Sequence, residues 1–228
     1  MDMDDLKRQA AYKAVELVED GMVVGLGTGS TAKHAVDRVA QRMREEGLRV
    51  IGVPTSSRTR EQARGLGIPL ASLEDEPALD LAIDGADEIE LGTLSLIKGA
   101  GGALLQEKLV EVSARTLVII ADESKKVHKL GGRFAVPVEV VRFGWKSTRE
   151  RLRALGCDAV LRGGDDPYIT DEQHYLLDCN FGLIDDAATL ADAIKSITGV
   201  VEHGLFIGMA SRAILATRGG IEILLPRS

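Results

Sequence analysis

The segment DGADEIELGTLSLIKGAGGALLQEK, residues 84–108, decides how the rest of this sequence is interpreted. The apolar run that leads into it, within LDLAIDGADEIE, stops at Asp84, which is typical of a buried parallel strand ending in a turn. Asp84 and Asp87 would then lie at the carboxyl end of that strand. Open α/β sheets bind their ligands at this edge, so the first half of the segment predicts two acids at a ligand site.

The second half of the segment repeats the pattern with a lysine in place of the acids. A short apolar run, residues 94–97, predicts a strand with Lys98 at its tip, and a glycine-rich loop, residues 99–102, follows. A helix is expected from about Ala103, with Glu107 in its first turns. A glycine loop that leads into a helix presents backbone N–H groups to an anion, so acid–base groups and an anion site are predicted together.

Composition excludes several classes of protein. The chain has 228 residues, 45% of them hydrophobic, enough for one large domain or two small ones. Its net charge of −7 disfavours nucleic acid as a partner, because such binding needs a basic surface. No apolar run approaches the roughly 20 residues that span a bilayer, and the acidic start, MDMDDLKRQA, is not expected to be a signal peptide. Cys157 and Cys179 fit reduced thiols in the cytoplasm better than a disulfide framework or a metal cluster.

Helical and strand patterns alternate through the first 130 residues. Helices are expected at 4–20, at 31–46 and from the polar turn TSSRT to Gly65, and strands at 22–26, 49–54, 68–70 and 116–121. This alternation predicts a parallel sheet covered by helices on both faces, which is a three-layer α/β domain.

The order of elements changes near Gly131. Strands are expected at 134–141, 159–162, 168–180 and 200–203, and helices at 146–155 and 190–197. The order strand–helix–strand–strand–helix–strand is that of a ferredoxin-like α+β unit. We therefore predict an α/β domain formed by residues 1–130 and 205–228, with an inserted ferredoxin-like domain at 131–204.

The motif GLGTGSTA, residues 25–32, follows an expected strand and opens an expected helix. Its glycines let the backbone approach a ligand, and the hydroxyls of Thr28, Ser30 and Thr31 suit a phosphate or a sugar oxygen. Two of the glycines match the start of a dinucleotide fingerprint, but Ser30 occupies the third glycine position and no acid follows the next strand. A nicotinamide cofactor is therefore a weak alternative, and a tight turn without a ligand is another.

Asp84, Asp87 and Lys98 each have a structural and a chemical interpretation. The aspartates either form a turn and cap a helix, or hold sugar hydroxyls and shuttle a proton between oxygens. A metal site is disfavoured, because no histidine or third acid lies nearby at ligand spacing. Lys98 is an ordinary surface lysine, a partner for an anion or a developing oxyanion, or a lysine that forms a Schiff base.

Glu107 lies off the apolar stripe that the helical pattern predicts. That stripe consists of Leu104, Leu105, the stem of Lys108, Leu109 and Val112. Most isolated glutamates on helices are solvated, but closeness in sequence to Lys98 and to the glycine loop favours a functional role here. Lys125, just past another expected strand, is either a surface residue or a phosphate ligand. The histidines share no motif and are expected to be structural or exposed; they are His34, His128, His174 and His203.

Four motifs in this order, GLGTGSTA, DGADEIE, KGAGGALLQEK and ADESKKV, resemble those of the A-type ribose-5-phosphate isomerases. The resemblance covers almost the whole chain. It implies interconversion of ribose 5-phosphate and ribulose 5-phosphate with neither a metal nor an organic cofactor. It implies a catalytic base at Glu107 and catalytic roles for Lys98, Asp84 and Asp87. The implied substrate-binding residues are Thr28, Gly29, Ser30, Thr31, Asp84, Gly85, Ala86, Asp87, Lys98, Gly99, Ala100, Gly101 and Lys125.

The resemblance also implies a mechanism. Glu107 would move a proton from C2 to C1 through an enediolate, which Lys98 would stabilise, while Asp84 and Asp87 would assist ring opening and proton exchange between O1 and O2. Whether the GTGST loop or Lys125 holds the phosphate stays open. The inserted domain would be a lid, and the enzyme a cytoplasmic homodimer or homotetramer of the pentose phosphate pathway. A sugar-phosphate sensor without activity is the alternative, although no basic helix-turn-helix segment precedes Asp4.

Overall fold

The computed structural model describes residues 2–227 and forms two compact units. The first unit comprises the chain up to Ala86, then Gln106–Lys125, then Met209 onward. The second unit comprises Asp87–Leu105 and Lys126–Gly208. Among the described residues, no helix is both long and apolar enough to cross a membrane.

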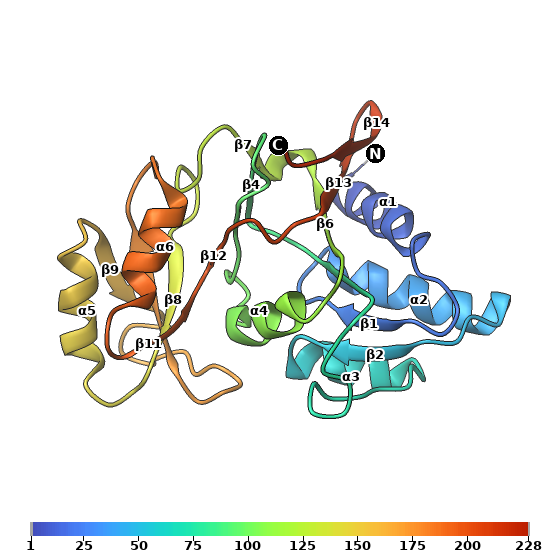
Figure 1. Cartoon of the computed structure of the whole chain (residues 1–228), viewed down its shortest axis with the longest axis horizontal. Helices are drawn as coiled ribbons and strands as arrows, with labels where there is room; N and C mark the ends of the chain where they lie inside the picture. The colour runs from blue at the N-terminus through green and yellow to red at the C-terminus, as the bar shows by residue number, and fades with distance from the viewer. Residues whose placement is uncertain (1, 228) are drawn as a thin grey trace. The chain divides into compact units, whose positions relative to one another are not determined.

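A six-stranded sheet organises the first unit (Figure 1). Its strands, in spatial order, are β14 (Gly220–Leu224), β13 (Arg212–Thr217), β6 (Leu117–Asp122), β3 (Leu81–Asp84), β1 (Val23–Leu26) and β2 (Ile51–Pro54). All neighbours are parallel except β13 and β14, which form an antiparallel hairpin at one edge. The last apolar segment was predicted to rejoin the first domain: its strand β13 pairs with β6 there, whereas residues 205–208 belong to the second unit.

Helices cover both faces of this sheet, as predicted. On one face, α1 (Met3–Val15), α2 (Ala32–Glu46) and α3 (Ser57–Gly65) contribute to a large apolar core with Val24, Ile83 and Ile120. On the other face, Val110 of α4 (Leu104–Val112) packs with Val53 and Leu79. This second contact is close: a Cβ atom at Gly25 would lie only 2.8 Å from Val110.

The first helix is shorter than the sequence predicted. It ends at Val15 instead of Asp20. The side chain of Arg42 in α2 donates to the carbonyl oxygens of Val15 and Val18, at 2.7 and 2.9 Å. These carbonyls lie at the end of α1, where backbone acceptors lose their partners within the helix. Arg42 therefore satisfies the helix end, and the residues that follow leave the helical path.

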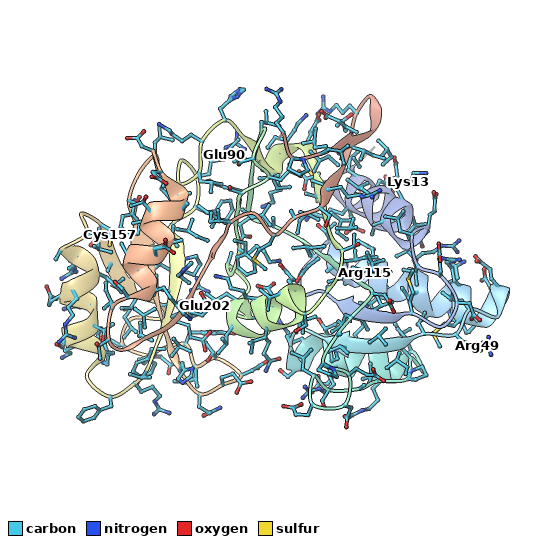
Figure 2. The ribbon with its side chains drawn as sticks, in the orientation of Figure 1. Lys13, Arg49, Glu90, Arg115, Cys157 and Glu202 are labelled. Atoms are coloured by element: carbon cyan, nitrogen blue, oxygen red, sulfur yellow. The ribbon has the colours of Figure 1, made fainter. Side chains whose placement is uncertain are left out.

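The two edges of the parallel sheet differ in chemistry. At the amino edge, Arg49 pairs with Asp20 and Arg115 pairs with Asp80, all with exposed side chains; Figure 2 labels the two arginines. Exposed pairs of this kind contribute little to stability. At the carboxyl edge, by contrast, the strands end in buried polar residues, which points to that edge as the functional one.

A second, small sheet belongs to the second unit and corrects one prediction. The sequence suggested that residues 94–97 repeat the pattern of the preceding parallel strand. Instead β5 (Leu96–Ile97) pairs antiparallel with β4 (Glu88–Glu90) and β12 (Leu205–Phe206), and β7 (Lys126–Val127) lies parallel to β4. The linker between β4 and β5 is too short for the crossover that a parallel pair requires.

The larger sheet of the second unit is antiparallel. Its spatial order is β11 (Val200–His203), β8 (Val136–Val140), β10 (Tyr175–Asn180) and β9 (Asp158–Leu161). Helix α5 (Trp145–Arg153) connects β8 to β9, and α6 (Ala187–Lys195) connects β10 to β11. The predicted order of strand, helix, strand, strand, helix and strand is therefore confirmed from β8 to β11.

The two units do not follow the predicted domain boundaries. We expected residues 131–204 to form the insertion, but 87–105, 126–130 and 205–208 also belong to the second unit. The reason is the small sheet, whose strands β4, β5, β7 and β12 pair with one another and so keep these segments together.

Glu88 ties the small sheet to the segment that leads into β8. Its carboxylate is fully buried and accepts the backbone N–H groups of Gly131 and Arg133, both at 2.7 Å, and of Phe134 at 2.9 Å. The sequence analysis did not single out this residue, because its partners lie more than forty positions away.

We predict that Glu88→Gln destabilises the protein by about 1–3 kcal/mol. The amide keeps one acceptor oxygen, but its NH₂ group would face a backbone N–H. That N–H would then lose its hydrogen-bond acceptor. Chemical denaturation monitored by circular dichroism measures the effect. Glu90→Gln, on the same strand but only half-buried, is the control and should change stability by less than about 0.5 kcal/mol. Equal stability of the two variants would contradict the anchoring role.

Candidate active site

The loop between β1 and α2 is built around the carboxylate of Asp84. The Asp84 side chain exposes 1% of its surface, and its Oδ1 accepts the backbone N–H groups of Thr28 at 3.0 Å and Gly85 at 2.6 Å. A Cβ atom at Gly27 would lie 2.3 Å from the same oxygen, so only glycine allows this approach. The predicted glycine loop and the first predicted acid are therefore brought together.

A cluster of buried hydroxyl groups holds the loop from the other side. The Oγ1 of Thr28 lies 2.7 Å from Thr55 Oγ1, 2.8 Å from Ser56 Oγ and 3.0 Å from Thr59 Oγ1. The sequence analysis treated TSSRT as a polar turn that lacks a ribose-binding acid. In the structure its hydroxyls orient Thr28, and the density of hydroxyls at the tip of β2 was the sequence feature that could have revealed this.

Lys7 is a further residue that the sequence analysis missed. It comes from α1, and its Nζ donates to Ser30 Oγ at 3.0 Å. The loop leads directly into α2, whose N-terminus carries the positive end of the helix dipole. A surface pocket of about 270 Å³ opens beside it, lined by Thr28, Gly29, Ser30, Lys33, Arg58, Thr59 and Gln62. Cations, hydroxyls and a helix N-terminus together suit an anion such as phosphate.

The end of β6 provides another polar group at the carboxyl edge. Asp122 exposes 1% of its surface, and its Oδ1 accepts the N–H and the hydroxyl of Ser124. Lys125 is the last residue of the short 3₁₀ helix Glu123–Lys125, which directly follows β6, and it is half-buried. Because β6 is the parallel neighbour of β3, Lys125 follows the strand next to the one that ends in Asp84.

Glu107 lies on the buried face of α4, which corrects the predicted stripe. Glu107 exposes 6% of its surface and Glu111, one turn later, exposes 2%, whereas Leu109 and Val112 are 47% and 62% exposed. The apolar pattern was misleading because the buried side of this helix carries two carboxylates. Glutamates are rarely buried to this extent, and this placement is compatible with the role predicted for Glu107.

Asp87 and Lys98 lie side by side on the small sheet. Glu88 is the register partner of Ile97, and the N–H of Asp87 donates to the Ile97 carbonyl at 2.8 Å. Lys98 exposes 2% of its surface, and its Nζ lies 5.5 Å from the centroid of the Phe206 ring, within cation–π range. The surface-lysine alternative is therefore wrong.

The glycine-rich loop after Lys98 is shaped by Asp87. The Asp87 Oδ2 accepts the backbone N–H of Ala100 at 2.9 Å. Gly99 and Gly102 have φ values of +103° and +84°, which side chains with a Cβ atom rarely adopt. The predicted residues Asp87, Lys98, Gly99 and Ala100 are thus adjacent, whereas Gly101 is exposed at the tip of the loop.

Two of the four histidines, His34 and His174, make structural contacts. His34 Nε2 lies 3.1 Å from Asp4 Oδ1, and this hydrogen bond is the main reason that the pKa of Asp4 is lowered. His174 Nδ1 lies 3.0 Å from Oε1 of Glu139, a carboxyl whose pKa is raised chiefly by burial. In the described part of the chain, no three or more His, Cys, Asp or Glu side chains gather as a metal ion would require.

Comparisons with known proteins agree on one family. The family model described as ribose 5-phosphate isomerase A (phosphoriboisomerase A) matches residues 51–220. The ribose-5-phosphate isomerase A of Synechococcus sp. (strain JA-3-3Ab) is 68% identical over 223 residues, which cover 97% of each chain. The solved structure of ribose 5-phosphate isomerase A from Methanocaldococcus jannaschii is 45% identical with a TM-score of 0.93, covering 97% of this chain and 99% of that one. A D-ribose-5-phosphate isomerase solved in complex with phospho-erythronic acid is 38% identical with a TM-score of 0.95, covering 99% and 100%.

We predict that Gly27→Ala displaces Asp84 and lowers stability by about 1–3 kcal/mol, because the added methyl group overlaps the carboxylate. The midpoint temperature of thermal unfolding and the isomerase activity should both fall. Gly65→Ala, at a glycine with open space around its Cβ position, is the control and should leave both unchanged or raise stability. A Gly27→Ala variant as stable and active as the wild type would show that the close approach is unnecessary.

Proposed function

The chain belongs to the ribose 5-phosphate isomerase A family, and on this premise we propose which of its residues carry out the reaction. The protein is an aldose–ketose isomerase that interconverts ribose 5-phosphate and ribulose 5-phosphate through an enediolate. The reaction takes a proton from C2 and returns one to C1. It therefore needs a base that can later act as an acid, and a cation beside the developing negative oxygen.

We propose Glu107 as this base. Its carboxylate would accept the C2 proton of ribose 5-phosphate, leaving the enediolate, and then deliver a proton to C1 to give ribulose 5-phosphate. The supporting observation is its burial on the inward side of α4, where the carboxylate is shielded from bulk water. One group serves both steps because C1 and C2 are adjacent.

We propose Lys98 as the cation that stabilises the enediolate, with Asp87 moving protons between O1 and O2. Lys98 is buried and held at the end of β5, where its backbone N–H donates to the Gly204 carbonyl at 2.9 Å. A fixed ammonium group out of water stabilises an oxyanion far more than a mobile surface lysine does. Asp84 would assist opening of the sugar ring.

The loop at residues 27–31 is our proposed phosphate site. Its hydroxyls, the N-terminus of α2 and the contact between Lys7 and Ser30 together supply donors and positive charge. Lys125, at the neighbouring strand end, would give further positive charge. The phosphate does not react, so its binding energy orients C1 and C2. Lys98 supplies the charge that a metal would otherwise provide, so we propose a reaction that needs neither a metal nor an organic cofactor.

Several wider features belong to the same proposal. The strand order β11-β8-β10-β9, with a helix after β8 and after β10, supports a ferredoxin-like domain from β8 to β11 that acts as a lid. The α/β unit would carry the catalytic base Glu107 together with Asp84 and the loop at residues 27–31. We also propose that the enzyme works as a homodimer or homotetramer in the cytoplasm, in the non-oxidative pentose phosphate pathway, with no nucleic-acid or membrane partner.

Glu107→Gln should lower kcat about 10²–10⁴-fold, because the amide cannot accept a proton. A coupled assay of ribulose 5-phosphate formation measures this. Glu111→Gln, which removes a second buried carboxylate from the same helix face, is the matched control and should keep most of the activity. Near-normal turnover in Glu107→Gln would refute the assignment.

Lys98→Met should lower kcat about 10²–10³-fold while folding normally, since methionine fills a similar apolar space without the charge. Lys129→Met, at a lysine paired with Asp185, is the control and should leave kcat unchanged. Addition of a chelator should leave the wild-type rate unchanged, and borohydride should trap no substrate on Lys98. A trapped adduct would favour the Schiff-base mechanism instead.

A further inference from the structure

One peptide group in the glycine-rich loop is held from both sides. The carbonyl oxygen of Gly99 accepts a hydrogen bond from Arg162 Nη1 at 3.0 Å, and the N–H of Ala100 donates to Asp87 Oδ2 at 2.9 Å. These two groups belong to the same peptide unit, and in a trans peptide they point in opposite directions. Arg162 and Asp87 therefore fix the orientation of this unit between them.

Arg162 is itself rigidly placed. The same Nη1 also donates to the Ala100 carbonyl at 3.2 Å, while Nε and Nη2 bind the carboxylate of Asp178, the Nε contact measuring 3.0 Å. Both side chains are largely shielded, with 19% and 33% exposed. A planar guanidinium that binds a carboxylate at two points has one orientation, so its remaining donors face the loop.

The segment that carries Arg162 is anchored to the core of the second unit. Arg162 directly follows β9, and its carbonyl accepts the N–H of Tyr168 at 2.9 Å. Further along, the fully buried Glu139 accepts the hydroxyl of Thr170 at 2.9 Å and contacts His174 at 3.0 Å. The ring of Tyr168 covers Gly102 so closely that a Cβ atom there would lie 2.3 Å from its hydroxyl. The loop is thus shaped by residues from a distant part of the sequence.

Without Arg162, the Gly99 carbonyl would keep only the hydrogen bond from the Gly102 N–H, at 3.0 Å, and the peptide would rotate more easily. Gly99 has a φ of +103°, and glycine crosses between backbone conformations at little cost. Rotation would turn the Gly99 carbonyl toward Asp87, where two negative oxygens repel, and would remove the N–H that Asp87 now accepts. The carboxylate beside Lys98 would lose its fixed position.

We infer that Arg162 is a positioning residue for the isomerisation. By holding the carbonyl oxygens of Gly99 and Ala100, it keeps the Ala100 N–H on Asp87 and so fixes the Asp87 carboxylate beside Lys98. Arg162 needs no contact with substrate to do this. The inference rests on the roles proposed above for Asp87 and Lys98.

The test compares full-length Arg162→Ala with Arg153→Ala. Arg153 is the matched control, because it also donates to a backbone carbonyl, that of Ala159 at 3.3 Å, and also pairs with acids. We expect Arg162→Ala to lose about 10–100-fold in kcat with little change in KM, and Arg153→Ala to keep its kcat. Should Arg162→Ala fail to fold, Arg162→Lys, which cannot hold two carbonyls and Asp178 together, should show the same loss.

Chemical rescue distinguishes a loss of kcat caused by the missing guanidinium group from a loss caused by a less stable fold. A surface pocket of about 390 Å³ is lined by Ala100, Arg133, Phe134, Ala135, Pro137, Arg162 and Asp178, so a small guanidinium can reach the vacated place. Methylguanidine, far below unfolding concentrations, should restore part of the kcat of Arg162→Ala and leave Arg153→Ala unchanged. A rise in the kcat of both variants, or of neither, would overturn the inference.

A double variant tests the route through Asp87. If Arg162 acts by placing Asp87, then Asp87→Asn/Arg162→Ala should be no slower than Asp87→Asn alone. Losses that multiply would overturn the inference, as would a folded Arg162→Ala with wild-type kcat. A wild-type kcat in Asp87→Asn would instead contradict the proposed role of Asp87, so the two failures are distinguishable.

Discussion

Ionisable side chains held out of water are the constraint on which this structure depends. Asp84, Lys98 and Glu107 expose 1%, 2% and 6% of their surface. Burying a charge is costly unless polar groups replace the lost water. For Asp84 those groups are backbone N–H donors, and they come close enough only because residue 27 is glycine. The glycine at residue 27 is therefore required by the buried carboxylate that it approaches.

The regular part of the fold was predictable because its causes are local. Apolar runs such as residues 116–121 and helical patterns such as 31–46 were found within two residues of their true ends. Where prediction failed, distant contacts overrode the local pattern. Residues 94–97 have the composition of a parallel strand, but their short linker makes them an antiparallel partner of β4. The first helix ends at Val15, and Arg42, from the next helix, binds the carbonyls of Val15 and Val18 there.

The candidate site was predictable only where its residues lie in short, continuous motifs. The motifs around Asp84, Lys98 and Glu107 were recognised, and each of these side chains is buried. Lys7 and Arg162 were missed, because the partner of each lies far away in the sequence. Lys7 binds Ser30, and Arg162 binds the Gly99 carbonyl. The buried face of α4 was also assigned wrongly, since an apolar pattern does not indicate a helix face that buries carboxylates.

The central claim is that one carboxylate and one ammonium group act on the same two carbons. A crystal structure of this protein with phospho-erythronic acid tests it most directly, because the planar carboxylate of that compound stands in for the two oxygens of the enediolate. The account predicts that Glu107 and Lys98 both lie within about 3.2 Å of that end of the ligand, with its phosphate on the loop at residues 27–31. A bound ligand whose carboxylate end touches neither side chain, or only one of them, would contradict it.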